Sequence, residues 1–179
     1  IDELDAQVRD HSEGREMTAN ILPSASAEKH YPIAFNLIPQ IDVFCDNLYT
    51  KEEMKMVNET KKIMEDYEMR ITATTIRVPV YRSHSESVNI ELEKEVDLGA
   101  MREALAKFPG VTVQDDPSKQ EYPMPLYTSE KDDVYVGRLR RDESCEKSYN
   151  MWVVGDQIRK GAALNTLQIA ETMIKNGWI

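Results

Sequence analysis

The chain has 179 residues, 41% of them hydrophobic and 30% charged, a composition typical of a globular protein with room for one domain and its core. Asp and Glu outnumber Lys and Arg by 32 to 22, and the net charge of −10 argues against binding nucleic acid or an anionic membrane surface, both of which favour a basic face. No apolar run approaches the roughly 20 residues that span a bilayer.

The first clear helix is predicted over residues 50–67. Thr50 is a suitable N-cap, and Glu53 three positions later completes a capping box. Met56, Thr60, Ile63 and Tyr67 then recur at helical spacing. Before this helix, residues 20–31 indicate an irregular connection, and residues 33–43 allow a short strand and a turn.

Two strands are predicted after this helix. Residues 70–80 are rich in Thr, Ile and Val, and residues 88–92 alternate between apolar and polar side chains. We expect these strands to pair antiparallel through residues 81–86. In the first strand, Ile76, Val78 and Val80 would face the core, and Arg77 would project from the more polar side.

The second half of the chain predicts a helix over residues 97–108, a short strand at 111–113, strands at 134–140 and 151–154, and a last helix over 157–176. The polar stretch between the short strand and Asp133 is too long for an ordinary turn, which predicts a functional segment or an interface arm. Together the elements predict an α+β fold: a mostly antiparallel or mixed sheet with helices packed on one face. The other face would then be available to a second copy of the same sheet.

Arg77 and His84 stand seven positions apart, where one predicted strand ends and the next begins. A guanidinium can grip a carboxylate through two parallel hydrogen bonds. An imidazole titrates near neutral pH and can act as a general acid or base. The alternatives are a surface ion pair for Arg77 and a solvated turn histidine for His84.

Two further groups could contact a ligand. Glu59 and Lys62 are three apart on the predicted helix, and they either form a surface ion pair or offer one anion and one cation to a charged ligand. Gly155, Asp156 and Gln157 precede the last predicted helix, where small residues and a helix N-terminus allow a polar group to approach or simply permit close packing.

Neither cysteine is predicted to be a nucleophile. Cys45 and Cys145 lack a neighbouring base, and no helix N-terminus is expected beside them to lower a thiol pKa. Their positions fit no zinc spacing, so we predict no metal site and expect a reducing, cytoplasmic compartment.

Several motifs resemble aspartate-semialdehyde dehydrogenase. In chain order they are NLIPQID at 36–42, ETKKI at 59–63, TIRVPV at 75–80, HSESV at 84–88, VGRLR at 136–140, WVVGDQ at 152–157 and KGAALN at 160–165. The similarity is collinear from about residue 20 to residue 174 and corresponds to the C-terminal half of that family. It implies a single catalytic and dimerisation domain over residues 1–179, similar to the C-terminal domain of glyceraldehyde-3-phosphate dehydrogenase.

The resemblance also implies the reaction. The family converts β-aspartyl phosphate to aspartate semialdehyde with NADPH, releasing phosphate, in the biosynthesis of lysine, threonine and methionine. By position, Arg77 resembles the arginine that grips the substrate carboxylate, Glu59 the glutamate at its amino group, and Lys62 the basic residue at its phosphate. His84 resembles the acid–base histidine, and Gln157 the amide residue near the nicotinamide.

The same resemblance places the glycine-rich nucleotide loop and the catalytic Asn-Cys segment in an N-terminal domain, and neither motif occurs in this chain. NADP would therefore be bound mainly by that domain, and the chain alone would be inactive. We expect a homodimer or homotetramer, with the helix over 157–176 packed back toward the cofactor site. The alternatives are a non-catalytic dimerisation or binding module, and an enzyme like N-acetyl-glutamyl-phosphate reductase.

Overall fold

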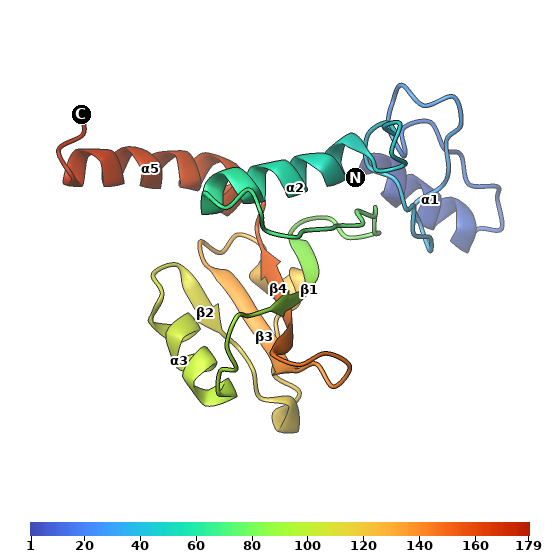
Figure 1. Cartoon of the computed structure of the whole chain (residues 1–179). Helices are drawn as coiled ribbons and strands as arrows, with labels where there is room; N and C mark the ends of the chain where they lie inside the picture. The colour runs from blue at the N-terminus through green and yellow to red at the C-terminus, as the bar shows by residue number, and fades with distance from the viewer. The chain divides into compact units, whose positions relative to one another are not determined.

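The computed structural model describes all residues from 1 to 179, and these form two compact units, Ile1–Tyr81 and Arg82–Ile179. The first unit contains helices α1 (Asp2–Ser12) and α2 (Lys51–Met64). The second contains a sheet, helix α3 and the C-terminal helix α5, as labelled in Figure 1. None of the helices combines the length and the hydropathy that crossing a membrane requires.

The first unit is held together by buried polar side chains as well as by apolar ones. Gln7 of α1 is 1% exposed. Its amide donates to the carbonyl of Thr18 at 2.8 Å and accepts from the backbone N–H groups of Ile33 and Ala34 at 2.9 and 3.0 Å. Because a buried amide without partners would be costly, these bonds fix α1 against the segment that contains the apolar core residues Ile33, Ala34 and Ile38.

The start of α2 confirms the predicted capping box. The Glu53 backbone N–H donates to the Thr50 hydroxyl at 3.3 Å, and the Glu53 carboxylate accepts from the Thr50 N–H at 2.8 Å. The helix stops at Met64, where Glu65 adopts a left-handed conformation with φ of 54°, so it is shorter than predicted. Its expected apolar stripe is largely exposed, with Ile63 at 77%.

The predicted strand over residues 70–80 does not form. Its backbone bonds instead to other segments: the Thr75 N–H donates to the Glu53 carboxylate at 2.8 Å, and Arg77 makes an isolated antiparallel bridge with Ile38. The expected orientation is also wrong, because Ile76 and Val78 are 43% and 40% exposed, whereas Arg77 is half-buried. With no sheet neighbour, the alternation of side chains in this segment does not define a core face.

The second unit is built on a four-stranded mixed sheet in the order β1-β4-β3-β2, comprising β1 (His84–Glu91), β2 (Val111–Val113), β3 (Val134–Arg141) and β4 (Ser148–Gly155). β4 pairs antiparallel with β1 and with β3, and β2 pairs parallel with β3. The mixed sheet is therefore confirmed, but the partner of β1 is β4 and not residues 70–80. The eight-residue register from His84↔Gly155 to Glu91↔Ser148 gives β1 a continuous ladder.

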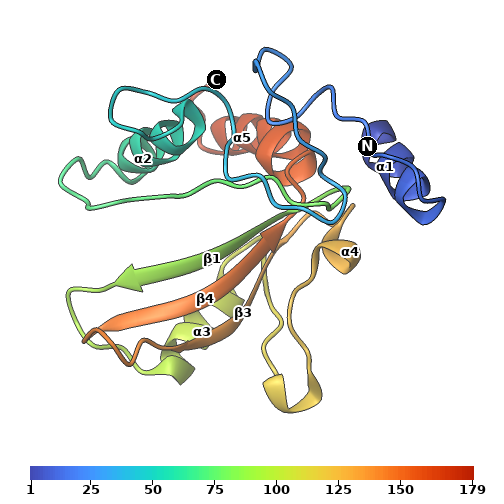
Figure 2. The same ribbon diagram turned by 90° about the vertical axis from the view of Figure 1, so that its right-hand side faces the viewer.

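Helix α3 (Leu98–Lys107) covers one face of this sheet (Figure 2). Met101 of α3 packs with Leu139 and Tyr149, and partly buried residues surround this core cluster: Ile90, Leu92, Val96, Leu98, Leu105 and Met151. Tyr149 is fully buried, and its hydroxyl donates to the Val96 carbonyl and accepts from the Val96 N–H, both at 2.7 Å. The sheet and α3 thus supply the main core of the second unit.

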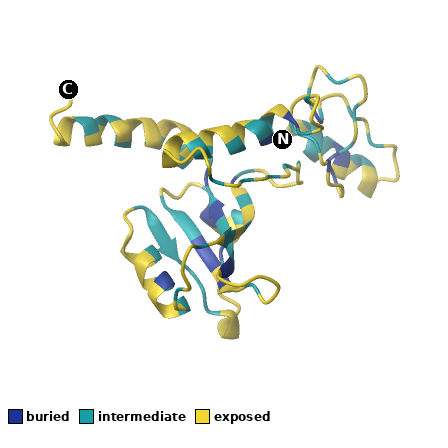
Figure 3. Ribbon diagram, in the orientation of Figure 1, coloured by how far each residue is buried: buried dark blue, intermediate teal, exposed yellow.

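The long polar stretch between β2 and β3 contains two short helices, the 3₁₀ turn η1 (Pro117–Lys119) and α4 (Pro125–Thr128). The predicted last helix is divided into a π-helical segment, η2 (Arg159–Ala163), and α5 (Leu164–Lys175). None of the residues of α5 is buried, and the helix is coloured as exposed and intermediate in Figure 3. Its large apolar side chains Leu167, Ile169 and Ile174 are exposed.

Candidate functional site

His84 is the first residue of β1 and lies opposite Gly155, the last residue of β4. Its imidazole is exposed, so a ligand can reach it. The backbone turns sharply just before it, because Ser83 has a φ of 77°, in the region that side-chain-bearing residues rarely adopt. The strand and this turn together place the histidine at one end of the sheet.

Gln157 lies beside this turn. Its Oε1 accepts a hydrogen bond from the Ser83 N–H at 2.9 Å, and the side chain is half-buried. This bond occupies the oxygen, and the amide nitrogen of Gln157 remains available to donate to a ligand. The structure therefore brings His84 and Gln157 to the same end of the sheet, although 73 positions of sequence separate them.

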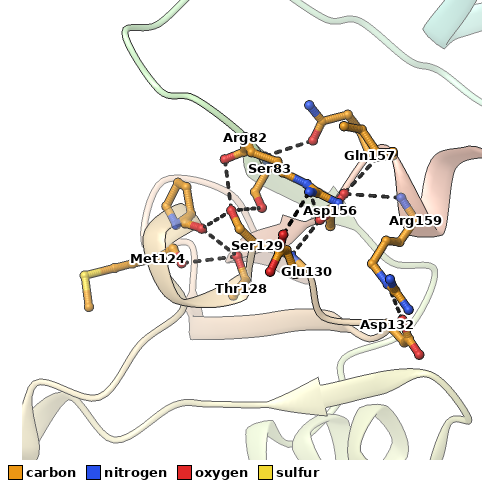
Figure 4. Close-up of polar contacts among 12 residues, drawn as sticks. Arg82, Ser83, Met124, Thr128, Ser129, Glu130, Asp132, Asp156, Gln157 and Arg159 are labelled. Carbon is orange, nitrogen blue, oxygen red and sulfur yellow. Dashed lines mark hydrogen bonds and ion pairs between the residues drawn. The ribbon is translucent and has the colours of Figure 1, made fainter. Parts of the chain in front are cut away.

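A buried carboxylate, that of Asp156, stands at the centre of the contacts around this end of the sheet (Figure 4). It is 0% exposed and accepts from the backbone N–H groups of Glu130, Ile158 and Arg159 at 2.7, 2.9 and 3.2 Å. The Arg82 Nε is 2.7 Å from its Oδ2, in an ion pair without the alignment of a hydrogen bond.

The Asp156 carboxylate stays ionised despite its burial. Burial disfavours the charged form, but the hydrogen bonds from Glu130, Arg159 and Ile158, together with the Arg82 guanidinium, outweigh it and lower the pKa of Asp156. The loop before β3 adds a second link, because the Ser129 hydroxyl lies 3.0 Å from that of Ser83. The long polar stretch thus reaches the site through its last residues.

In the sequence, Asp156 stands out only as part of a segment before a predicted helix, and neither Arg82 nor Glu130 is indicated as a site residue. An aspartate at the position before a predicted helix is an N-cap signal, and the Asp156 bonds to the N–H groups two and three residues on have that geometry. The neighbouring sequence does not indicate Glu130 as a site residue, because its contact with Asp156 joins residues 26 positions apart.

In the first unit, Arg77 is half-buried. Its Nη2 donates to the carbonyl of Pro23 at 3.4 Å, and its buried Nε has no hydrogen-bond partner. The alternative interpretation of Arg77, an ion pair with a nearby Asp or Glu, does not form. A half-buried guanidinium whose Nε–H has no partner in the fold keeps hydrogen-bond donors for a carboxylate.

Glu59 and Lys62 lie on the exposed surface of α2. They do not pair with each other in the structure, so the surface ion pair that their spacing allows does not form. Both charges point into solvent, where they are accessible to a charged ligand. These two residues and Arg77 belong to the first unit, whereas His84 and Gln157 belong to the second.

No hydrogen bond joins either cysteine to the candidate residues of its own unit. Cys145 lies in the turn between β3 and β4 and is exposed, at the end of β4 opposite to the His84↔Gly155 pair. Seven residue steps of strand separate the two ends of that ladder, about 23 Å at about 3.3 Å per residue. Cys45 sits in a tight turn, with its N–H donating to the Tyr49 carbonyl at 2.7 Å.

Comparison with known proteins identifies the family. The model of the family described as semialdehyde dehydrogenase, dimerisation domain, matches residues 1–160. The chain belongs to this family. Among curated relatives, the aspartate-semialdehyde dehydrogenase of Aquifex aeolicus is 48% identical over 179 residues, which are 100% of this chain and 51% of that protein. The resemblance to aspartate-semialdehyde dehydrogenase is therefore confirmed.

Solved structures agree with the α+β fold of this dimerisation domain. The aspartate semialdehyde dehydrogenase II of Vibrio cholerae is 39% identical, with a TM-score of 0.87 over 97% of this chain and 49% of that chain. The same protein complexed with ASA gives a TM-score of 0.86. The Candida albicans enzyme with NADP is 24% identical, with a TM-score of 0.66 over 82% of this chain and 46% of its own. The chain spans about half the length of these relatives.

Proposed function

We propose that this chain is the C-terminal catalytic and dimerisation part of an aspartate-semialdehyde dehydrogenase. The enzyme would convert β-aspartyl phosphate to aspartate semialdehyde and release phosphate. The observation that carries the proposal is the meeting of His84 and Gln157 at one end of the sheet, in a chain that is 48% identical to a curated aspartate-semialdehyde dehydrogenase. Both residues lie in motifs that resemble that family.

In this proposal, three residues of the first unit bind the substrate. The Arg77 guanidinium grips the α-carboxylate, a role supported by its unpartnered buried Nε. Glu59 meets the amino group and Lys62 the phosphate, because each offers an accessible charge of the required sign. The substrate would thus be recognised through each of its charged groups.

His84 would exchange the proton of the reaction, a role supported by its exposure at the end of β1. Gln157 would hold the cofactor, and it fits NADP because its free amide nitrogen can donate to a carboxamide oxygen on the nicotinamide. When bound, NADPH supplies the hydride that reduces the acyl group. The thiolate and most cofactor contacts would come from the other half of the protein, in keeping with the position of Cys145 next to the opposite end of the β1–β4 ladder from His84.

The assembly is a further part of the proposal. Residues 1–179 would act as one catalytic and dimerisation domain in a homodimer or homotetramer, with the sheet face opposite α3 against a second copy. The helix over 157–176 would pack back toward the cofactor site, which would cover the apolar side chains that α5 now exposes. The enzyme would work in the cytoplasm.

The proposal is tested by expressing the protein that carries this chain at full length, beside the 179-residue chain alone. We expect the full-length protein to reduce NADP when given aspartate semialdehyde and phosphate, and to be inactive on N-acetyl-glutamate semialdehyde. The 179-residue chain should give no turnover. A full-length protein inactive on aspartate semialdehyde would overturn the proposal in favour of a non-catalytic module, and activity only on the N-acetylated substrate would favour the related reductase.

A further inference from the structure

The Asp156 carboxylate connects three segments of the second unit that are distant in sequence. Its Oδ2 accepts from Glu130 N–H and pairs with Arg82, while its Oδ1 accepts from the N–H groups of Ile158 and Arg159. Three N–H donors and one guanidinium converge on two oxygens, so the carboxylate is fully engaged within its own fold. Because both oxygens of Asp156 are taken by these contacts, the carboxylate cannot also bind a ligand.

Two of these three segments carry the residues assigned to the reaction. Arg82 immediately precedes Ser83, whose N–H donates to the Gln157 oxygen and whose neighbour is His84. Asp156 itself immediately precedes Gln157. Because Ser83 has a φ of 77°, the turn is not held by backbone preference and depends on the contacts that flank it.

We infer that Asp156 is a positioning residue: its carboxylate, paired with Arg82, fixes the turn at Ser83 and so points the amide nitrogen of Gln157 toward the nicotinamide. This inference rests on the proposed function, specifically on the role of Gln157 toward NADP. Without the carboxylate, neither Arg82, which precedes Ser83, nor the backbone that precedes Gln157 is held in place, so the Ser83–Gln157 hydrogen bond is weakened. The Gln157 amide can then rotate and present either its oxygen or its nitrogen.

Asp156→Asn is the sharpest substitution, since it preserves size while replacing one accepting oxygen with a donating nitrogen. Either orientation of the new amide sets its NH₂ against N–H groups that now donate to Asp156. Asp132→Asn is the matched control. Asp132 is exposed and pairs with the Arg159 side chain, so Asp132→Asn removes the same charge nearby without altering Asp156 or Gln157.

The measurement is the dissociation constant of NADPH, by fluorescence titration of the full-length protein, together with kcat. We expect Gln157→Ala and Asp156→Asn each to weaken NADPH binding by about three- to ten-fold, the loss of one net hydrogen bond. The double variant should be no weaker than Gln157→Ala alone, because both substitutions remove the same contact. Asp132→Asn should bind as the unmodified protein does. A merely structural role for Asp156 would lower the active fraction and leave the dissociation constant unchanged.

The outcomes separate the two claims. If Gln157→Ala binds NADPH normally, the cofactor role of Gln157 is wrong, and the inference falls with it. If Gln157→Ala weakens binding but Asp156→Asn does not, or if the two effects multiply in the double variant, only the positioning role is overturned. Should Asp156→Asn fail to fold, Arg82→Gln decides the matter, since the Arg82 side chain is 27% exposed. It is expected to weaken NADPH binding in the same direction, and normal binding would overturn the inference.

Discussion

At the residue scale, Glu53 shows how one buried carboxylate organises the first unit. Its Oε2 accepts from the Thr50 N–H and its Oε1 from the Thr75 N–H, both at 2.8 Å. The bond from Thr50, opposed by burial and aided by the bond from Thr75, lowers the pKa of Glu53 below its usual value of 4.5. The stabilisation is therefore fully present above that pH and is lost as the pH falls through the lower folded-state pKa.

We predict that Glu53→Gln lowers the free energy of unfolding by about 1–3 kcal/mol, the cost of leaving a buried donor without an acceptor. The amide offers one acceptor where two N–H groups require one each. Urea denaturation at neutral pH measures the loss, and at pH 3 the difference between variant and parent should shrink. The control is Glu52→Gln in the same helical turn, whose side chain is 36% exposed. It should change stability by less than about 1 kcal/mol, and equal losses in the two variants would contradict this account.

Residues differ in how far the sequence reveals them. The Thr50–Glu53 capping box was predictable because both partners lie within four positions, and the structure confirms it. The Glu53–Thr75 bond and the Asp156–Glu130 bond cross 22 and 26 positions, and nothing local encodes them. His84 was singled out by its chemistry and its place near Arg77, and the role of Gln157 by a family resemblance; the proximity of His84 to Gln157 follows only once β1 pairs with β4.

At the element scale, the sheet depends on an irregularity in β3. The register with β4 shifts between Gly137 and Arg140, and Arg138 adopts a φ of 54°. The Asp115 carboxylate accepts from the Arg138 N–H at 2.7 Å and pairs with Arg102 at 2.9 Å. The bulge is thus pinned by a nearly buried carboxylate from the polar stretch after β2.

Gly137 has no room for a side chain. An added Cβ would lie 2.2 Å from the Gln114 carbonyl oxygen and 2.6 Å from the Pro123 ring, so the backbone would have to move. We predict that Gly137→Ala lowers the free energy of unfolding by about 1–3 kcal/mol or more. Gly161→Ala is the control, because its Cβ would meet only the Gln157 Cβ at 3.9 Å, and it should be neutral or stabilising by up to about 1 kcal/mol. Thermal unfolding of both variants measures this, and equal midpoints would refute the packing argument.

The elements predicted best are those with local signals. Helix α3 and strands β2 and β3 begin and end within one or two residues of the predicted positions, because capping residues, alternation and a Pro-Gly pair mark them. The strand over residues 70–80 was wrong because β propensity does not supply a partner. Strand β4 begins at Ser148, three residues before the predicted start. Ser148–Asn150 lack a continuous apolar run, which a strand does not require on both of its faces.

At the scale of the whole molecule, the residues proposed for the reaction fall in two separate units. Arg77, Glu59 and Lys62, which we propose bind the substrate, belong to Ile1–Tyr81, and His84 and Gln157 belong to Arg82–Ile179. The chain spans about half the length of its relatives, and Cys145, the cysteine of the second unit, lies next to the end of the β1–β4 ladder opposite to His84. In our proposal, this chain would therefore hold the substrate and exchange a proton, and the rest of the protein would supply the thiolate and bind most of the cofactor.

The most direct test of that account is the steady-state kinetics of two variants of the full-length enzyme with aspartate semialdehyde. His84→Asn should lower kcat by about 100-fold or more, the typical contribution of a general acid–base, with little change in KM. Arg77→Lys keeps the charge but loses the planar fork, so it should mainly raise KM for the substrate. Equal and small effects of both substitutions on kcat and KM would contradict the assigned roles and leave both residues with a purely structural function.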